Sequence, residues 1–285
     1  MTASPVSHRV TTVADALTGA SKRIAAVSDS PGLDAELLLA QILKLRRAQL
    51  PIRGADVLSA SSAQAFEALV ARRCQGEPVA YLRGSKGFWT LDLEVTPAVL
   101  VPRPETELLV EWALQCVHDV AQPALVDLGT GSGAIGLSLA SERGDAQILA
   151  TDRSASALAV ARANASRLNL SVEFQRGDWY AACAGRRFEL VVSNPPYVAG
   201  DDRHLDALRA EPREALTPEG DGLSALRAII AGAPGHLKAG GRLLVEHGAD
   251  QGAAVRALFE AAGFTAIETR RDLAGLERAS GGIRA

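Results

Sequence analysis

The residues Asn194-Pro195-Pro196-Tyr197 combine groups that can hold one planar nitrogen. The Asn194 side-chain oxygen and the Pro195 carbonyl can both accept hydrogen bonds from a single NH2 group, and the Tyr197 ring can cover the flat face of the group that carries it. We therefore predict that Asn194, Pro195, Pro196 and Tyr197, the tetrad, clamp an amide or amine nitrogen. A rigid turn without chemistry is the alternative for these residues.

An apolar run places the tetrad at the end of a strand. Residues 188–193 (Phe-Glu-Leu-Val-Val-Ser) have the pattern of a buried strand. Two successive prolines cannot donate to a sheet ladder, so the strand must end before them. Open α/β sheets bind ligands at the carboxyl ends of their strands, which favours a binding site at the tetrad.

A glycine-rich segment upstream has the features of a cofactor loop. Residues 125–128 are apolar except for Asp127, and a helical pattern follows the loop. The loop glycines admit a ligand close to the backbone and open the amino end of a helix, so we predict that the loop binds a cofactor. Its candidate residues are Gly129, Thr130, Gly131, Ser132 and Gly133. Asp152 ends the next predicted strand, where a carboxylate can accept hydrogen bonds from ribose hydroxyls. The glycine spacing alone fits NAD enzymes and S-adenosylmethionine enzymes equally well.

The two motifs in this order resemble the class I S-adenosylmethionine-dependent methyltransferases that act on amino or amide nitrogen. More specifically, the chain resembles the HemK/PrmC family, the glutamine N5-methyltransferases of peptide chain release factors. The Val-Pro-Arg-Pro-Glu-Thr-Glu block at 101–107 is specific to that family. Other segments in family order are 34–38, 76–84, 211–216, 221–223, Glu246-x-Gly248-x-x-Gln251 and 272–275.

The resemblance implies a fold, a cofactor and a substrate. It implies a doubly wound, mostly parallel α/β sheet, S-adenosylmethionine as cofactor with S-adenosylhomocysteine as product, and a release factor as protein partner. The methyl acceptor is then the glutamine of a Gly-Gly-Gln motif, whose NH2 donates to Asn194 and Pro195 while Tyr197 packs on the amide. Trp179 is expected to flank the adenine, with an ordinary core Trp as the alternative.

Three other functions fit part of the sequence. A DNA adenine N6-methyltransferase uses a similar tetrad, but it must flip a base and hold a polyanion, and this chain has a net charge of −3 with no clustered basic arm. A dehydrogenase function would leave the tetrad without a role. The tetrad also argues against a protein that binds a nucleotide without catalysis, because such a protein does not need it. No histidine is required, so we expect His204 and His247 to be ordinary surface or core residues, and Glu105 and Glu107 to anchor a loop or cap a helix.

The composition is that of a soluble cytoplasmic enzyme. The chain has 285 residues, of which 47% are hydrophobic and 22% charged. No apolar run approaches the ~20 residues that span a bilayer, and Met1–Pro5 lacks the basic start and apolar stretch of a signal peptide. Cys74, Cys116 and Cys183 are far apart and lack metal-ligand spacing, so we expect reduced thiols, no disulfide framework and no metal site.

The apolar periodicity divides the chain near residue 80. Helical spacing before that point predicts an amino-terminal helical bundle at 1–80 that docks the substrate, with a mere cap on the catalytic domain as the alternative. Residues 81–101 are expected to form a hairpin or linker, and 102–285 the methyltransferase domain, with alternating strands and helices. We expect strands near 124–128, 147–152, 171–175, 188–193, 241–247 and 264–269. Residues 276–282 are poor in strand formers, so the sequence does not decide whether a last strand follows.

Overall fold

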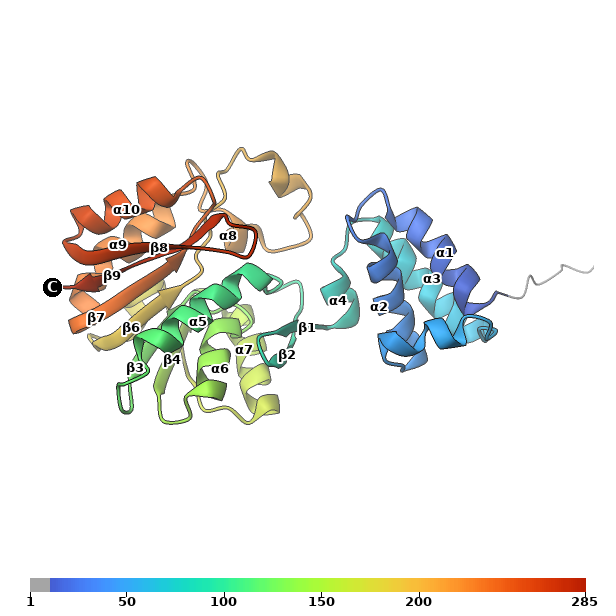
Figure 1. Ribbon diagram of the computed structural model, residues 1–285, viewed down its shortest axis with the longest axis horizontal. Helices are drawn as coiled ribbons and strands as arrows, with labels where there is room; N and C mark the ends of the chain where they lie inside the picture. Colours follow the sequence, from blue (N-terminus) through green and yellow to red (C-terminus); the bar gives the residue numbers. More distant parts are fainter. Residues whose placement is uncertain (1–10) are drawn as a thin grey trace, which may run out of the picture. The chain divides into compact units, whose positions relative to one another are not determined.

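The computed structural model describes residues 11–285, and the chain divides into two compact units, Met1–Gly84 and Ser85–Ala285 (Figure 1). The signal-peptide expectation concerns Met1–Pro5, which lies outside the described residues, as do residues 1–10 of the predicted helical domain. Among residues 11–285, no helix is both long and apolar enough to cross a membrane.

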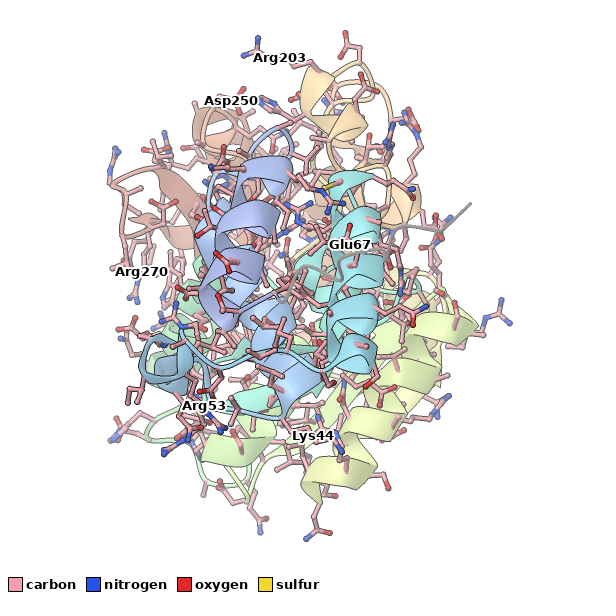
Figure 2. All side chains as sticks on the ribbon, turned by 90° about the vertical axis from the view of Figure 1, so that its right-hand side faces the viewer. Lys44, Arg53, Glu67, Arg203, Asp250 and Arg270 are labelled. Atoms are coloured by element: carbon pink, nitrogen blue, oxygen red, sulfur yellow. The ribbon has the colours of Figure 1, made fainter. Side chains whose placement is uncertain are left out.

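The first unit is a small helical bundle with a core of its own. Its core side chains include Ile24, Leu38, Phe66 and Val70, all 3% exposed or less. Charged residues such as Lys44, Arg53 and Glu67 point away from this core (Figure 2). Its elements are α1 (Val13–Ile24), α2 (Pro31–Leu43), η1 (Arg47–Gln49), η2 (Pro51–Arg53), α3 (Ala60–Cys74) and α4 (Val79–Arg83).

Pro31 and Gly84 mark two helix boundaries of this unit, and the second departs from the predicted linker at 81–101. Pro31 occupies the first position of α2, because a helix start needs no N–H at that residue and favours the fixed φ of proline. Residues 81–83 lie in α4 and not in a linker, and this helix ends at Gly84, whose φ of +73° suits a residue without a side chain.

The second unit is built around a seven-stranded sheet of order β5-β4-β3-β6-β7-β9-β8. A separate antiparallel hairpin of β1 (Ser85–Phe88) and β2 (Leu91–Glu94) precedes it. The neighbours from β5 to β7 are parallel, whereas β9 runs antiparallel to both β7 and β8. The strands are β3 (Ala124–Leu128), β4 (Gln147–Asp152), β5 (Glu173–Arg176), β6 (Phe188–Ser193), β7 (Leu237–Glu246), β8 (Phe264–Arg271) and β9 (Glu277–Arg284). The predicted doubly wound, mostly parallel fold is confirmed.

Helices cover both faces of the sheet, as side-chain alternation along the strands requires. Leu125 and Val192 face a core shared with α5 and α6, whereas Val126 and Val191 face a core shared with α9 and α10. The remaining helical elements are η3 (Pro104–Thr106), α5 (Glu107–Cys116), α6 (Ala134–Glu142), α7 (Ala155–Leu168), η4 (Trp179–Cys183), η5 (Arg203–Asp206), α8 (Arg213–Leu216), α9 (Ser224–His236) and α10 (Gly252–Ala261).

A last strand does form after Gly275, despite its weak strand propensity. β9 pairs with a neighbour on each side, so both edges of its backbone are hydrogen-bonded. At Gly281 an added Cβ would lie 2.5 Å from Leu244 Cδ2 and 2.9 Å from Trp112 Cη2. The glycine therefore lets a neighbouring strand and α5 pack closely, which local propensity does not register.

The strand order brings the two sequence motifs together. After β3 the chain adds β4 and β5 on one side, and then returns to place β6 on the other side of β3. Leu128 at the end of β3 pairs with Ser193 at the end of β6, and the Ser193 hydroxyl donates to the Leu128 carbonyl at 2.7 Å. The glycine loop and the tetrad thus leave adjacent strands at the point where strand order reverses, the usual binding site of such sheets.

Candidate active site

A cleft of about 740 Å³, including its open mouth, lies at the carboxyl ends of β3, β4 and β6. Six of the residues predicted for the site line it, and they come from both motifs: Gly129, Gly131, Asp152, Trp179, Asn194 and Pro196.

The other predicted residues lie behind the cleft wall. The Thr130 hydroxyl donates to Asp127 Oδ2 at 2.6 Å, the Ser132 carbonyl accepts from Asn164 Nδ2 at 3.0 Å, and Gly133 caps α6. Pro195 is buried and Tyr197 half-buried, and neither is among the lining residues. The first three hold the glycine loop in shape, and the last two belong to the turn that carries Asn194 and Pro196.

The buried Asp127 carboxyl supports the glycine loop through hydrogen bonds. Its Oδ2 accepts from the Thr130 hydroxyl and, at 3.0 Å, from the Gly136 amide, whereas Oδ1 has no hydrogen-bond partner within residues 11–285. Burial raises the pKa of this carboxyl to about 6, an effect that the hydrogen bonds from Thr130 and Gly136 partly offset.

The glycine loop and Asp152 together fit a cofactor with a ribose. Gly131 has a φ of +56°, and an added Cβ would meet no atom within 4 Å, so the backbone is open to a ligand there. Asp152 Oδ2 accepts from the Gly131 amide at 3.0 Å, and Oδ1 accepts from the Ser154 amide at 2.8 Å. Each carboxylate oxygen keeps a lone pair for a ribose hydroxyl. Trp179 supplies a flat apolar wall beside Gly129.

The side-chain amide of Asn194 is hydrogen-bonded to Thr106. Asn194 Nδ2 donates to Thr106 Oγ1 at 3.0 Å, and Thr106 is 4% exposed. With its NH2 group engaged on the protein side, the Asn194 side chain has its oxygen, an acceptor only, left for a ligand in the cleft. The family-specific block at 101–107 therefore reaches the tetrad through Thr106.

Glu246, at the end of β7, binds the tyrosine of the tetrad. Tyr197 donates its hydroxyl to Glu246 Oε1 at 3.0 Å, while Oε2 accepts no well-formed hydrogen bond within the described part of the chain. Burial raises the pKa of Glu246 to about 7; hydrogen bonding from the Thr106 and Tyr197 hydroxyls and the positive charge of Arg278 work against this rise. The pKa of Tyr197 is also raised, first by burial and then by the charge of Glu246.

Two further contacts fix the segments around the tetrad. Gln251 Nε2 donates to the Tyr197 carbonyl at 2.9 Å, and Gln251 Oε1 accepts from the Gly248 amide at 2.9 Å. Glu211, 6% exposed, accepts from the Val101 amide at 2.9 Å and pairs with Arg103. The segments singled out at 101–107, 211–216 and 246–251 are thus joined around one site.

The structure also places residues for which the sequence offered no role. Ala98, Val99 and Leu100 line the cleft, and Thr106 and Glu246 support it. The Glu246-x-Gly248-x-x-Gln251 spacing marked Glu246 and Gln251 without showing what they touch. Sequence periodicity gives no signal for the apolar stretch 98–100, because it lies outside any helix or strand.

Three of the titratable residues expected to take no part in the chemistry, His204, His247 and Glu107, bind groups outside the tetrad. His204 is exposed and pairs with Asp202, while His247 is buried and hydrogen-bonds to Ser280 through Nε2 at 2.8 Å. Glu107 accepts from the Trp89 amide at 2.8 Å and so anchors the β1–β2 hairpin, as predicted. Within residues 11–285, no group of three or more His, Cys, Asp or Glu side chains is arranged to hold a metal ion.

Two family models match the chain, the PrmC N-terminal domain at residues 15–84 and the methyltransferase small domain at 105–223. The chain is 53% identical to the release factor glutamine methyltransferase of Burkholderia pseudomallei, over 88% of this chain and 91% of that protein. It is 53% identical to the protein of the same name from Xylella fastidiosa (strain Temecula1), over 88% and 92%. The one from Pseudomonas aeruginosa is 49% identical, over 88% and 92%.

Solved structures of lower similarity share the fold. A methyltransferase from Pyrococcus furiosus, 18% identical, superimposes with a TM-score of 0.52 and covers 75% of this chain and 97% of its own. A 16S rRNA methyltransferase from T. thermophilus, solved with AdoMet and guanosine, is 18% identical with a TM-score of 0.53 and covers 70% and 50%. Both confirm a Rossmann-like α/β fold.

Proposed function

Because the chain belongs to the family of release factor glutamine methyltransferases, we propose that it methylates the glutamine of the Gly-Gly-Gln motif in peptide chain release factors. The acceptor is the side-chain nitrogen N5, and the methyl donor is S-adenosylmethionine. The observation that carries this proposal is the position of Asn194 in the cleft wall, with its NH2 group bound by Thr106 and its oxygen left for a substrate NH2.

The acceptor nitrogen in this reaction is a poor nucleophile, because the lone pair of an amide nitrogen is delocalised into its carbonyl. S-adenosylmethionine supplies a methyl group that is already activated by a positively charged sulfur. The protein's task is therefore positioning, which can contribute up to ~7–11 kcal/mol in favourable cases. Gly129, Gly131, Asp152 and Trp179 are proposed to hold the cofactor, because they share the cleft wall with Asn194 and Pro196.

The tetrad is proposed to aim the substrate nitrogen. Asn194 Oδ1 and the Pro195 carbonyl accept the two N–H bonds, which points the nitrogen lone pair at the methyl group. As the N–C bond forms and the C–S bond breaks, positive charge grows on the nitrogen, and these two acceptors stabilise it until one proton leaves. Tyr197, held at its hydroxyl by Glu246 and at its carbonyl by Gln251, keeps the turn rigid.

The experiment that tests this function compares two substrates. The purified protein is incubated with labelled S-adenosylmethionine and either a release factor or duplex DNA rich in adenine, and products are mapped by mass spectrometry. We expect one methyl group on the glutamine of the Gly-Gly-Gln motif and none on DNA. Methylated adenine together with an unmodified release factor would show that the substrate assignment is wrong.

The helical unit is proposed to dock the release factor away from the chemistry, in the cytoplasm where translation terminates. The described part of this unit has its own apolar core, while both cores of the second unit lie within residues 85–285. Removal of residues 1–84 should raise KM for an intact release factor and leave the S-adenosylmethionine affinity nearly unchanged. An unchanged KM in a folded truncation would assign the unit a purely structural role.

A further inference from the structure

The turn between β8 and β9, residues 272–276 (the leucine turn), carries apolar side chains that the proposed chemistry does not use. Leu273 is fully exposed and Leu276 is 48% exposed. In the second unit, Ser85–Ala285, which is described throughout, no other large hydrophobic side chain is exposed. Exposed apolar side chains that are confined to one turn mark a candidate surface for contact with another protein.

Hydrogen bonds hold the leucine turn in one shape. Asp272 Oδ1 accepts from the Ala274 and Leu276 amides, each at 3.0 Å. Its Oδ2 accepts from Arg278 Nε at 3.2 Å, and the Asp272 amide donates to the Leu276 carbonyl at 2.9 Å. The turn is therefore formed before any partner binds, so little conformational entropy is lost when another protein covers its apolar side chains.

The leucine turn lies at the same edge of the sheet as the tetrad. Ser193, at the end of β6, pairs with Val245 of β7. The next residue of β7, Glu246, pairs with Ala279 of β9. Since neighbouring strands are ~5 Å apart and rise ~3.3 Å per residue, β9 is about 10 Å from β6, and Leu276 lies about 10 Å beyond the level at which the tetrad begins. The turn therefore projects from the edge of the sheet at which the cleft opens.

We propose that Leu273 and Leu276 form a docking surface for the body of the release factor whose glutamine enters the cleft. Stable protein–protein interfaces bury ~800 Å² on each partner, an area that extends about 16 Å from its centre. A release factor centred on the cleft with an interface of this size covers the leucine turn as well. Its matching surface is an apolar depression near the Gly-Gly-Gln motif, deep enough to bury both leucines. This inference rests on the proposed function, because it takes the release factor as the substrate.

The charges around the leucine turn indicate the chemistry of its partner. Arg271 pairs with Glu277 at 3.2 Å. Arg278 pairs with Asp272, also at 3.2 Å. Because these four groups have counter-charges within the chain, the turn offers apolar contact and needs no charged group on its partner. A second copy of this chain is a poor occupant, since it would stand where the body of a protein substrate has to approach the cleft.

The test measures kcat and KM for an intact release factor with wild type, Leu273→Ser and a double variant that adds Leu276→Ser. Burial of one leucine side chain raises affinity by about tenfold or more, so KM should rise about tenfold in the single variant and further in the double variant. The kcat and the S-adenosylmethionine Kd should stay at wild-type values, because the lost contact is made equally before and during methyl transfer. Leu273→Met keeps an apolar tip and should retain the wild-type KM, as should the matched control Ala274→Ser in the same exposed turn.

Three outcomes of this test would overturn the proposal. The first is a wild-type KM in both serine variants. The second is a lowered kcat with an unchanged KM, which would mean that the turn supports the tetrad and does not bind the substrate. The third is a wild-type dimer that Leu273→Ser converts to a monomer in ultracentrifugation while KM stays unchanged, which would make a second copy of the chain the occupant. Because Leu273 is fully exposed, the variants should unfold at the wild-type temperature.

A binding measurement that needs no methyl transfer separates this inference from the proposed function. The Kd of the release factor is measured by calorimetry in the presence of S-adenosylhomocysteine, and Leu273→Ser should raise it about tenfold. If wild type methylates the release factor and the serine variants bind it as tightly as wild type, the docking surface is wrong and the proposed function stands. If wild type binds the release factor without methylating it and Leu273→Ser binds it about tenfold more weakly, the substrate assignment fails and the docking surface stands.

Discussion

Asp127 and Glu246 are two fully buried carboxyl groups that support the two halves of one cleft, and they acquire their partners differently. Asp127 accepts from Thr130 and Gly136, which lie three and nine residues away in the chain. Glu246 accepts from Tyr197, 49 residues away, and Thr106, which binds the Asn194 amide, comes from η3. The carboxylate behind the glycine loop thus has partners close in sequence, whereas the tetrad is supported from β7 and η3.

The comparison shows why a change in one half should leave the other half intact. Each half has its own hydrogen-bond donors, and the two strand ends are joined by β3–β6 pairing and by the hydrogen bond from Ser193 to the Leu128 carbonyl. We therefore expect changes at the tetrad to act on kcat and changes at the glycine loop or Asp152 to act on cofactor affinity. The following measurements test that separation, from the largest expected effect to the smallest.

Asn194→Ala should have the largest effect, because it removes an acceptor for the charge that develops on the substrate nitrogen. By analogy with the loss of one oxyanion-hole donor, kcat should fall by about 10²–10³-fold. The S-adenosylmethionine Kd, measured by calorimetry, should change far less. Asn194→Asp is the control that keeps an acceptor, and it should retain part of the activity. Equal turnover by Asn194→Ala and wild type would contradict the division of labour.

Asp152→Ala should show the opposite pattern. Loss of a charged acceptor for ribose hydroxyls should weaken S-adenosylmethionine binding by ~1.5–3 kcal/mol, with kcat at saturating cofactor near wild type. The exposed Asp145, which pairs with Arg143 just before β4, offers a control in Asp145→Ala. If calorimetry detects tight NAD binding and none of S-adenosylmethionine, the cofactor assignment is wrong.

Asp127 and Glu246 should affect stability alike, although they affect function differently. Burial raises their pKa values from 3.8 to about 6 and from 4.5 to about 7. At pH values between the ordinary pKa and the raised pKa of each carboxyl, the folded protein holds a proton that the unfolded chain has released. The free energy of unfolding therefore falls as pH rises, and this loss is complete above about pH 7. Asp127→Asn and Glu246→Gln should each remove part of this loss, on the order of 1–3 kcal/mol.

Unfolding measured at pH 5 and pH 8 tests this expectation, with wild type as reference. The free energy of unfolding of each variant, relative to that of wild type, should be higher at pH 8 than at pH 5. Asp127→Asn should also weaken cofactor binding, whereas Glu246→Gln should spare it and lower kcat. A pH 5 to pH 8 difference identical in all three proteins would mean that neither carboxyl has the raised pKa.

Gln251→Ala should have the smallest effect. It removes the hydrogen bond to the Tyr197 carbonyl but leaves the Tyr197–Glu246 contact in place. One hydrogen bond of this kind contributes ~0.5–1.5 kcal/mol, so kcat/KM should fall only a few-fold. A loss as large as that of Asn194→Ala would show that the turn, and not the Asn194 acceptor, limits the reaction.

Local sequence was enough to predict most of the fold. The apolar runs at Ala124–Leu128 and Phe188–Ser193 were predicted as strands and are strands β3 and β6. The predicted loop after β3 does open α6. The strand β9 could not be decided in this way, because Gly281 and Gly282 have no side-chain preference that marks a strand. Their place in the sheet follows from pairing on both sides and from close packing against Leu244.

The sequence by itself determined the reactive groups and the strand ends that carry them. The Asn194–Tyr197 tetrad ends a strand because proline cannot pair, and Asp127 finds its partners within one turn. Only the tertiary structure decided what stands behind the tetrad. Thr106, Glu246 and Gln251 come from separate segments, and local patterns do not encode contacts that form only when those segments fold together. The orientation of the Asn194 amide, on which the proposed chemistry depends, follows from those long-range contacts.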